Sequence, residues 1–127
     1  MKFTLNVTPV PKGRPRATVR NGHAILYTPK ETREAEAIIR QLVTVSEKFE
    51  ADIPLSLKAV FYVPKPNVKR EYPTVKPDLD NYVKLLIDSL QGILFPDDKQ
   101  IVDIQCSKRY GEPRIEVEID KLKSEQE

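Results

Sequence analysis

The sequence predicts an α+β fold in which a mixed β-sheet of about five or six strands packs against two main helices. Three observations support this fold class. Segments with alternating apolar residues occur near both ends and in the middle of the chain, as in half-buried strands. Two longer segments between them carry apolar residues at helical spacing. The 127 residues are enough for one domain with a modest core.

The N-terminal quarter is expected to contain a strand followed by a β-hairpin. Phe3, Leu5 and Val7 alternate with polar residues, which is typical of a strand with one buried face. A basic loop follows. Segment 17–27 is predicted to be a hairpin, because the Asn-Gly pair at positions 21–22 favours a type I′ turn.

The first helix is expected to run from Thr28–Pro29 to about Phe49. Thr28 suits the N-cap position and Glu31 completes a capping box, while Pro29 suits the first helical position. The predicted apolar stripe of this helix consists of Ala35, Ile38, Ile39, Leu42 and Val43.

The remaining elements follow from the same two periodicities. Segment 55–63 is a strand candidate with one apolar face, and the proline-rich segment 64–77 is expected to be an extended loop. A second helix is predicted from about residue 79 to 91, and two paired strands over 101–110 and 114–120. The apolar stripe of the second helix consists of Leu79, Val83, Leu86, Ile87 and Leu90.

The charge, the cysteine count and the distribution of apolar residues indicate the cellular location of the protein. The net charge is only +2, and the single cysteine, Cys106, excludes an internal disulfide and a cysteine-built zinc site. The apolar residues at the start alternate, unlike those of a signal peptide, and no run approaches the roughly 20 apolar residues of a membrane helix. We therefore expect a soluble cytoplasmic protein with one domain over residues 1–122 and a polar tail over residues 123–127.

Acidic residues gather near the start of the second predicted helix. In isolation, Asp78 and Asp80 are explained as an N-cap and a first-turn acid. A second pair, Asp97 and Asp98, lies on a loop that can fold back toward that helix, although both also suit a turn. Mg²⁺ prefers oxygen ligands and keeps several waters, so two or three carboxylates are enough. The acids therefore predict a Mg²⁺ site built from Asp78, Asp80 and an acid of the Asp97–Asp98 pair, with Mn²⁺ as an alternative metal.

A lysine accompanies these acids. Lys84 lies one helical turn after Asp80, and Asp88 lies one turn further, so that all three share a polar stripe opposite the leucines. An ammonium in this position would stabilise the charge that develops on a phosphate during hydrolysis. The alternative is an ordinary surface ion pair.

Cations gather in segments 11–20 and 65–76, whereas acidic residues collect between Asp78 and Asp103. The cations would draw DNA phosphates toward carboxylates that otherwise repel them. The alternative is that loop cations only keep a small protein soluble. The expected phosphate contacts are Lys12, Arg14, Arg16, Lys69, Arg70 and Lys76.

Several motifs along the chain are characteristic when taken together: PVPKGRPR at 9–16, YTP at 27–29, KPDLDNYVK at 76–84, IDSL at 87–90, GIL at 92–94 and DDKQI at 97–101. Together they resemble one protein family, the RusA Holliday junction resolvases. The resemblance covers roughly residues 3 to 119, and its central motif is more specific than a lone Asp-x-Asp.

The resemblance implies a homodimeric, Mg²⁺-dependent endodeoxyribonuclease that binds four-way DNA junctions and nicks two strands symmetrically. Asp78 and Asp80 match the two acids of the central motif, and Lys84 matches the essential lysine of the family. Asp98 matches the second acid of the later pair, so the resemblance implies that Asp78, Asp80 and Asp98 hold the metal. The interval before that pair is shorter than in the best-known form, so Asp97 stays open as the alternative.

Two other classes of function remain open. The first is a non-catalytic module of the same fold that binds DNA junctions. The second is a small-molecule phosphohydrolase, whose Asp-x-Asp motif usually follows a buried strand rather than Lys76-Pro77. A dimer is expected from the two-fold symmetry of a junction. Its interface is expected on strand surfaces and on the apolar segment 93–95.

Overall fold

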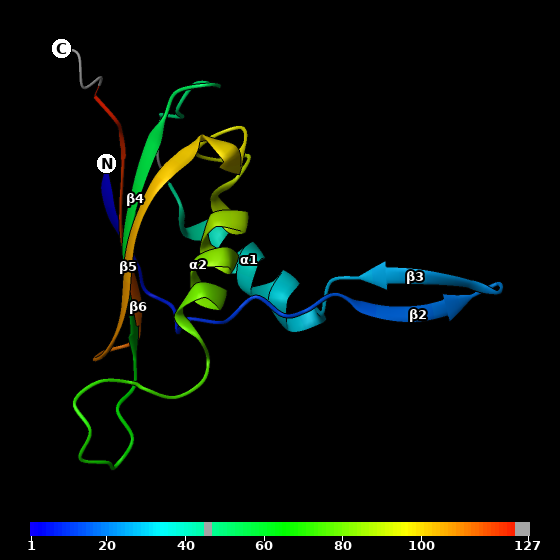
Figure 1. Ribbon diagram of the computed structural model, residues 1–127, viewed down its shortest axis with the longest axis horizontal. Coiled ribbons are helices and arrows are strands. Elements are labelled where there is room, and N and C mark those ends of the chain that lie inside the picture. The colour runs from blue at the N-terminus through cyan, green and yellow to red at the C-terminus, as the bar shows by residue number, and fades with distance from the viewer. Residues whose placement is uncertain (45–46, 124–127) are drawn as a thin grey trace.

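The computed structural model describes residues 1–44 and 47–123, so the last four positions of the predicted tail lie outside the described residues. Both helices lie on one side of a sheet, and a hairpin projects away from them (Figure 1). The strands are β1 (Lys2–Leu5), β2 (Arg16–Arg20), β3 (His23–Tyr27), β4 (Leu55–Val63), β5 (Ile101–Tyr110) and β6 (Arg114–Lys121). The helices are α1 (Lys30–Leu42), α2 (Leu79–Leu90) and the short 3₁₀ helix η1 (Asp98–Gln100).

The main sheet has the strand order β1-β6-β4-β5. Strand β4 pairs antiparallel with β6 and parallel with β5, so the sheet is mixed as expected. Parallel neighbours require a crossover, and here the crossover contains α2. The α+β class and the two helices are thus confirmed. Within the described residues this sheet has four strands rather than five or six, because β2 and β3 form a separate two-stranded sheet.

The hairpin itself has the predicted turn. Asn21 and Gly22 have φ angles of 53° and 77°, so both residues are left-handed, as a type I′ turn requires. The strands pair from Arg16 opposite Tyr27 to Arg20 opposite His23. What the turn chemistry does not predict is that the hairpin stands apart from the rest of the protein (Figure 1).

Helix α1 differs from its prediction at both ends. Pro29 occupies the N-cap position, so the capping box expected from Thr28 and Glu31 does not form within the described residues. The helix ends at Leu42 rather than near Phe49, because β-branched residues follow it and favour extended backbone. Of the intervening residues, 45 and 46 lie outside the described ranges.

The apolar stripe of α1 is also narrower than predicted. Ala35 and Ile39 are buried, whereas Ile38 and Leu42 keep 48% and 44% of their surface exposed. Among the described elements α1 packs mainly against α2, and these two apolar side chains are left at the surface.

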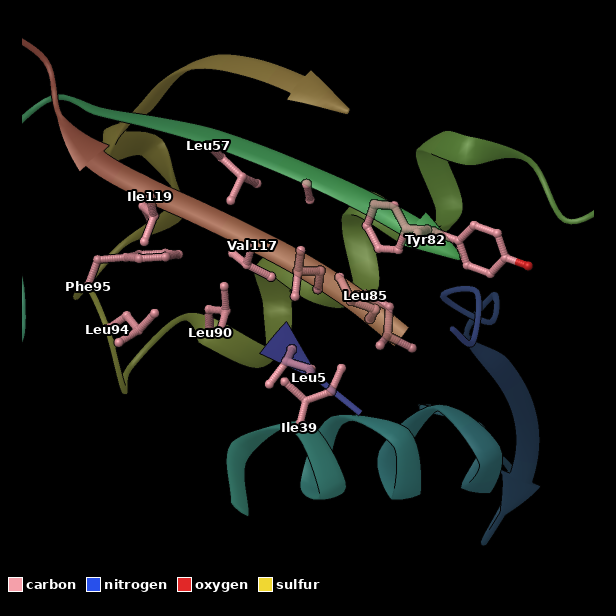
Figure 2. Packing of buried hydrophobic residues seen from close by; sticks show 14 of the residues in the cluster. Leu5, Ile39, Leu57, Tyr82, Leu85, Leu90, Leu94, Phe95, Val117 and Ile119 are labelled. Carbon is pink, nitrogen blue, oxygen red and sulfur yellow. The ribbon is translucent and has the colours of Figure 1, made fainter. Parts of the chain in front are cut away.

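The hydrophobic core lies between the sheet and α2 (Figure 2). The alternate residues of β4 from Leu55 to Phe61 face it, as their spacing predicts. The ring of Tyr82 stacks on Phe61 with 5.5 Å between centroids, which fixes α2 against β4. The most buried face of α2 is rotated from the predicted stripe toward Tyr82 and Leu85. Burial raises the pKa of the Tyr82 hydroxyl.

The expected dimer interface on segment 93–95 is wrong for two of its three residues. Leu94 and Phe95 are 0% and 1% exposed and belong to the core of the chain itself (Figure 2). Their burial anchors the loop between α2 and η1.

No helix among the described residues is long and apolar enough to cross a membrane.

Candidate active site

One face of α2 and the loop before β5 enclose a shallow hollow of about 210 Å³, here called the trough. Asp80 and Lys84 contribute to its wall from successive turns of α2, and Asp98 contributes from η1. The sequence separates these groups by a helix and a loop, yet the fold brings them to one cavity. The complete lining is Asp80, Val83, Lys84, Ile87, Asp88 and Asp98.

Asp78 lies just outside the lining of the trough. It occupies the N-cap position of α2 but makes no side-chain capping hydrogen bond to the described residues. The simple explanation of Asp78 as a capping side chain therefore does not hold. Its exposed carboxylate stands one residue before α2, and Asp80 lies in the first turn.

The two acids of the later pair have different surroundings. Asp97 is the N-cap of η1, where its carboxylate accepts a hydrogen bond of 3.0 Å from the backbone N–H of Lys99. That bond holds the pKa of Asp97 below its usual range. Asp98 instead lines the trough. The capping box of η1 thus occupies the carboxylate of Asp97, whereas Asp98 is left in the lining of the trough with Lys84.

Two glutamines hold this loop in place. The side-chain oxygen of Gln91 accepts a hydrogen bond of 2.9 Å from the backbone N–H of Asp98. Gln100 is buried and accepts from the backbone N–H of Asp97 at 3.1 Å, while its amide donates to the carbonyl of Glu50 at 2.7 Å. Asp98 is therefore fixed by polar contacts as well as by the burial of its loop.

Lys12 makes ion pairs within the protein. Its ammonium lies 2.9 Å from Glu36 of α1 and 3.1 Å from Asp88 of α2. Burial alone would lower the pKa of Lys12, but the hydrogen bonds and charges of the two carboxylates outweigh it and raise the pKa above its ordinary value. The backbone N–H of Lys12 also donates to the carbonyl of Asn81 at 2.9 Å. Lys12 therefore joins the basic loop to both helices.

The rest of that loop is held by a close backbone approach. The backbone N–H of Gly13 donates to the hydroxyl of Thr32 at 3.0 Å. A Cβ at Gly13 would lie only 2.7 Å from that oxygen, so a larger residue would displace the loop. Arg14 and Arg16 follow with exposed side chains.

The cations of the second predicted group all lie on the proline-rich loop. Lys69, Arg70 and Lys76 are exposed. Arg70 donates to the hydroxyl of Tyr110 at 2.8 Å, which ties this part of the loop to the end of β5.

Two cations that the sequence analysis did not select also position the site. Arg40 of α1 donates to the carbonyls of Asp88 and Ser89, at 3.0 and 3.1 Å, near the C-terminal end of α2. Lys108 of β5 donates to the carbonyls of Val75 and Pro77, at 2.8 and 2.9 Å, immediately before Asp78. The register places Lys108 opposite the buried Phe61. A cation at an inward position of a strand is a signal for a polar partner, and it was available in the sequence.

Lys108 is therefore expected to restrain the approach to Asp78. In the Lys108→Met variant the loop should open more often, and trypsin should cleave it after Lys69 or Arg70 about fivefold faster, the effect of roughly 1 kcal/mol. Mass spectrometry of timed digests measures this rate. Lys58→Met, which removes an exposed lysine from β4, should leave it unchanged. Equal cleavage of both variants would show that Lys108 does not hold the loop.

The donor groups of the trough suit a hard divalent cation. Within residues 1–44 and 47–123, no three Asp, Glu, His or Cys side chains converge closely enough to hold a metal ion as they stand. Mg²⁺ does not require such a cage, because it keeps several waters and commonly binds to one or two protein carboxylates. Asp80 and Asp98 line the same cavity and provide that number. The residues present therefore fit Mg²⁺ by chemistry and by number.

The fold and the trough together define an α+β protein with helix-borne carboxylates and a lysine in one open cavity. Residues 6–120 match the family described as Endodeoxyribonuclease RusA. The chain belongs to this RusA family, which confirms the resemblance inferred from the motifs and supports a nuclease.

Two relatives extend the comparison. The chain is 37% identical over 135 aligned positions to the uncharacterized protein YqaN of Bacillus subtilis (strain 168), and the match covers 94% of each chain. It is 39% identical over 77 positions to the protein named crossover junction endodeoxyribonuclease rusA of Lactococcus phage r1t, covering 58% of this chain and 59% of that protein.

Proposed function

We propose that the protein is a Mg²⁺-dependent endodeoxyribonuclease that binds four-way DNA junctions as a homodimer and resolves them by paired, symmetric nicking. The observation that carries the proposal is the trough, because it gathers Asp80, Lys84 and Asp98 from two separate segments. Family membership and the name of the phage relative support the choice of DNA junctions as substrate.

The proposed metal ligands are Asp78, Asp80 and Asp98. When bound, Mg²⁺ supplies Lewis-acid polarisation of a phosphate and eases deprotonation of an attacking water. Asp80 and Asp98 hold their positions through α2 and the η1 capping box. Asp78 is proposed as the third ligand because it is the N-cap residue of α2, two residues before Asp80.

Lys84 is proposed to stabilise the negative charge that grows on the phosphate during hydrolysis. It lines the trough between Asp80 and Asp88, within reach of a phosphate held there. Asp88 is already paired with Lys12, so it acts as a positioning residue that links the basic loop to α2.

The exposed cations of the two basic loops are proposed to contact the DNA backbone on either side of the trough. Arg14 and Arg16 lie two and four residues after Lys12, whose ion pairs fix the loop beside α2. Lys69, Arg70 and Lys76 lie on the loop that leads into Asp78. For Lys12 itself, a phosphate contact would compete with Glu36 and Asp88.

A labelled four-way junction tests the proposal directly. The full chain should nick two opposite strands in Mg²⁺ or Mn²⁺, and it should bind the junction without nicking when the metal is chelated. Binding without nicking in every divalent metal tried would instead support the non-catalytic junction-binding module. A protein that only binds DNA would not need clustered carboxylates, because they repel the phosphates. We therefore favour the enzyme.

The different surroundings of the two neighbouring acids give a matched pair of variants. Asp98→Asn should raise the Mg²⁺ concentration for half-maximal nicking at least about tenfold, because one charged ligand contributes more than the roughly 1.4 kcal/mol of a tenfold change. Asp97→Asn should behave like the wild type, because asparagine caps a helix as well as aspartate does. A Mg²⁺ titration of the nicking rate checks both. The reverse result would assign the ligand to Asp97.

The two exposed arginines of the first basic loop predict a change in salt dependence. Replacing Arg14 and Arg16 together with alanine should weaken junction binding and reduce the slope of log affinity against log salt by about 2, one unit for each lost phosphate contact. Fluorescence anisotropy at several salt concentrations measures this slope. As a control, Lys2→Ala with Lys58→Ala removes two exposed cations from the sheet. If both double variants give the same slope, the arginines are not phosphate contacts.

A further inference from the structure

The hairpin formed by β2 and β3, here called the arm, projects from the rest of the protein (Figure 1). Its two strands pair only with each other, and neither makes extensive contact with another element of the described chain. An isolated two-stranded ribbon is marginally stable in water unless another surface covers one of its faces. The arm therefore lacks the packing that would normally hold such a hairpin.

The register of the arm separates its side chains into two unlike faces, because residues directly opposite one another share a face. One face, here called the apolar face, consists of Ala17, Val19, Ala24 and Leu26. The other consists of Arg16, Thr18, Arg20, His23, Ile25 and Tyr27. On the apolar face, Val19 and Leu26 are 75% and 73% exposed. This face contains no group that could bind a phosphate.

A second apolar surface lies beside α1. Ile38 and Leu42 are exposed there, and Ile38 borders a groove of about 270 Å³. All but one of the groove's side chains are hydrocarbon, and none is charged. The lining, which we call the α1 groove, is Val7, Thr8, Val10, Ala35, Ile38, Ile39, Leu85 and Ile115.

The arm does not cover the groove of its own chain. It joins α1 at the N-terminal end of that helix and extends away from both helices (Figure 1). The occupant that matches the uncharged groove is thus the apolar face of the arm of another copy.

We propose that two copies of this chain exchange arms, so that the apolar face of each arm lies on the α1 groove of the other copy. Such an exchange obeys two-fold symmetry and buries both surfaces twice. Each arm strand is only about 17 Å long, so two contacts are needed to approach the area of a stable interface. The opposite face of the arm, with Arg16 and Arg20, remains exposed to solvent in this arrangement.

The exchange follows from the two surfaces alone, and only its use in paired nicking rests on the proposed function. In a two-fold dimer, each arm would carry its cations from one trough toward the DNA beside the other. The apolar face of the arm would thus contact the second copy, and the opposite face would contact a nucleic acid backbone.

Sedimentation of the full chain at micromolar concentration tests the exchange. The wild type should have the mass of a dimer, whereas Leu26→Asp and Ile38→Asp should each have the mass of a monomer. Thr18→Asp places the same charge on the opposite face of the arm and should remain a dimer. Circular dichroism establishes that each variant is folded, so a monomer does not reflect unfolding.

Mixing the two monomeric variants makes the test specific. An equimolar mixture of Leu26→Asp and Ile38→Asp should contain more dimer than either variant alone at the same concentration. One of the two contacts in a mixed pair is intact, whereas both are altered between two copies of the same variant. A monomeric wild type, a dimeric Leu26→Asp variant or a mixture without recovery would overturn the proposal. If Leu26→Asp kept the mass of a dimer but bound the junction more weakly, the proposal would also be overturned, because the apolar face would then contact DNA. None of these masses depends on nicking, so failure of the nuclease proposal would be seen separately.

Discussion

Asp80→Asn is expected to retain junction binding and to lose nicking by at least about 100-fold, the effect typical of losing one group that stabilises the transition state. Asp80 lines the trough in the first turn of α2, beside Lys84. The change removes a charge but little volume, so the helix should persist. Binding should be as tight as in the wild type or tighter, because one carboxylate no longer repels phosphates.

Single-turnover nicking and anisotropy on the same junction separate these two effects. Asp103→Asn makes the identical chemical change at an exposed position of β5 and should alter neither. If the Asp80 variant nicked at the wild-type rate, the trough would not take part in phosphodiester hydrolysis. Loss of binding together with nicking would show that Asp80 has a structural role.

Phe95→Ala is expected to destabilise the protein by about 3–5 kcal/mol, the range for removing a fully buried aromatic side chain. Phe95 is 1% exposed and lies in the loop that leads from α2 to Asp98 (Figure 2). The same change should therefore release the position of Asp98. We expect nicking to fall even at temperatures where the variant is fully folded.

Chemical denaturation measures the loss of stability, and nicking measured well below the unfolding transition isolates the effect on the site. Ile93→Ala shortens a partly buried side chain of the same loop and should cost less stability. If both variants lose equal stability, or if the folded Phe95 variant nicks normally, Phe95 does not anchor the site.

The elements that could be predicted from the sequence are those whose periodicity agrees with their burial. Strand β4 alternates throughout, and its bounds and buried face are as predicted. The position of α2 also follows from its pattern, although Tyr82 was not included in its stripe. The predicted end of α1 was wrong, because residues at helical spacing continue beyond Leu42 while local β-branching favours extended backbone.

Contacts between distant segments explain what the sequence could not decide. Lys12 appears in the sequence as one loop cation among several, yet Glu36 and Asp88 from two helices converge on it. The different surroundings of Asp97 and Asp98 depend on Gln91 and Gln100, whose partners no local pattern predicts. Burial of the 93–95 segment likewise depends on where α2 packs.

The crossover through α2 has a consequence for the order in which the protein matures. Asp80 precedes β5 in the chain, and η1, which carries Asp98, immediately precedes β5. Strand β5 pairs in parallel with β4, and pairing between distant parts of a chain is slow to form. We therefore expect Asp98 to reach its place in the trough late in folding, when the last strands join the sheet.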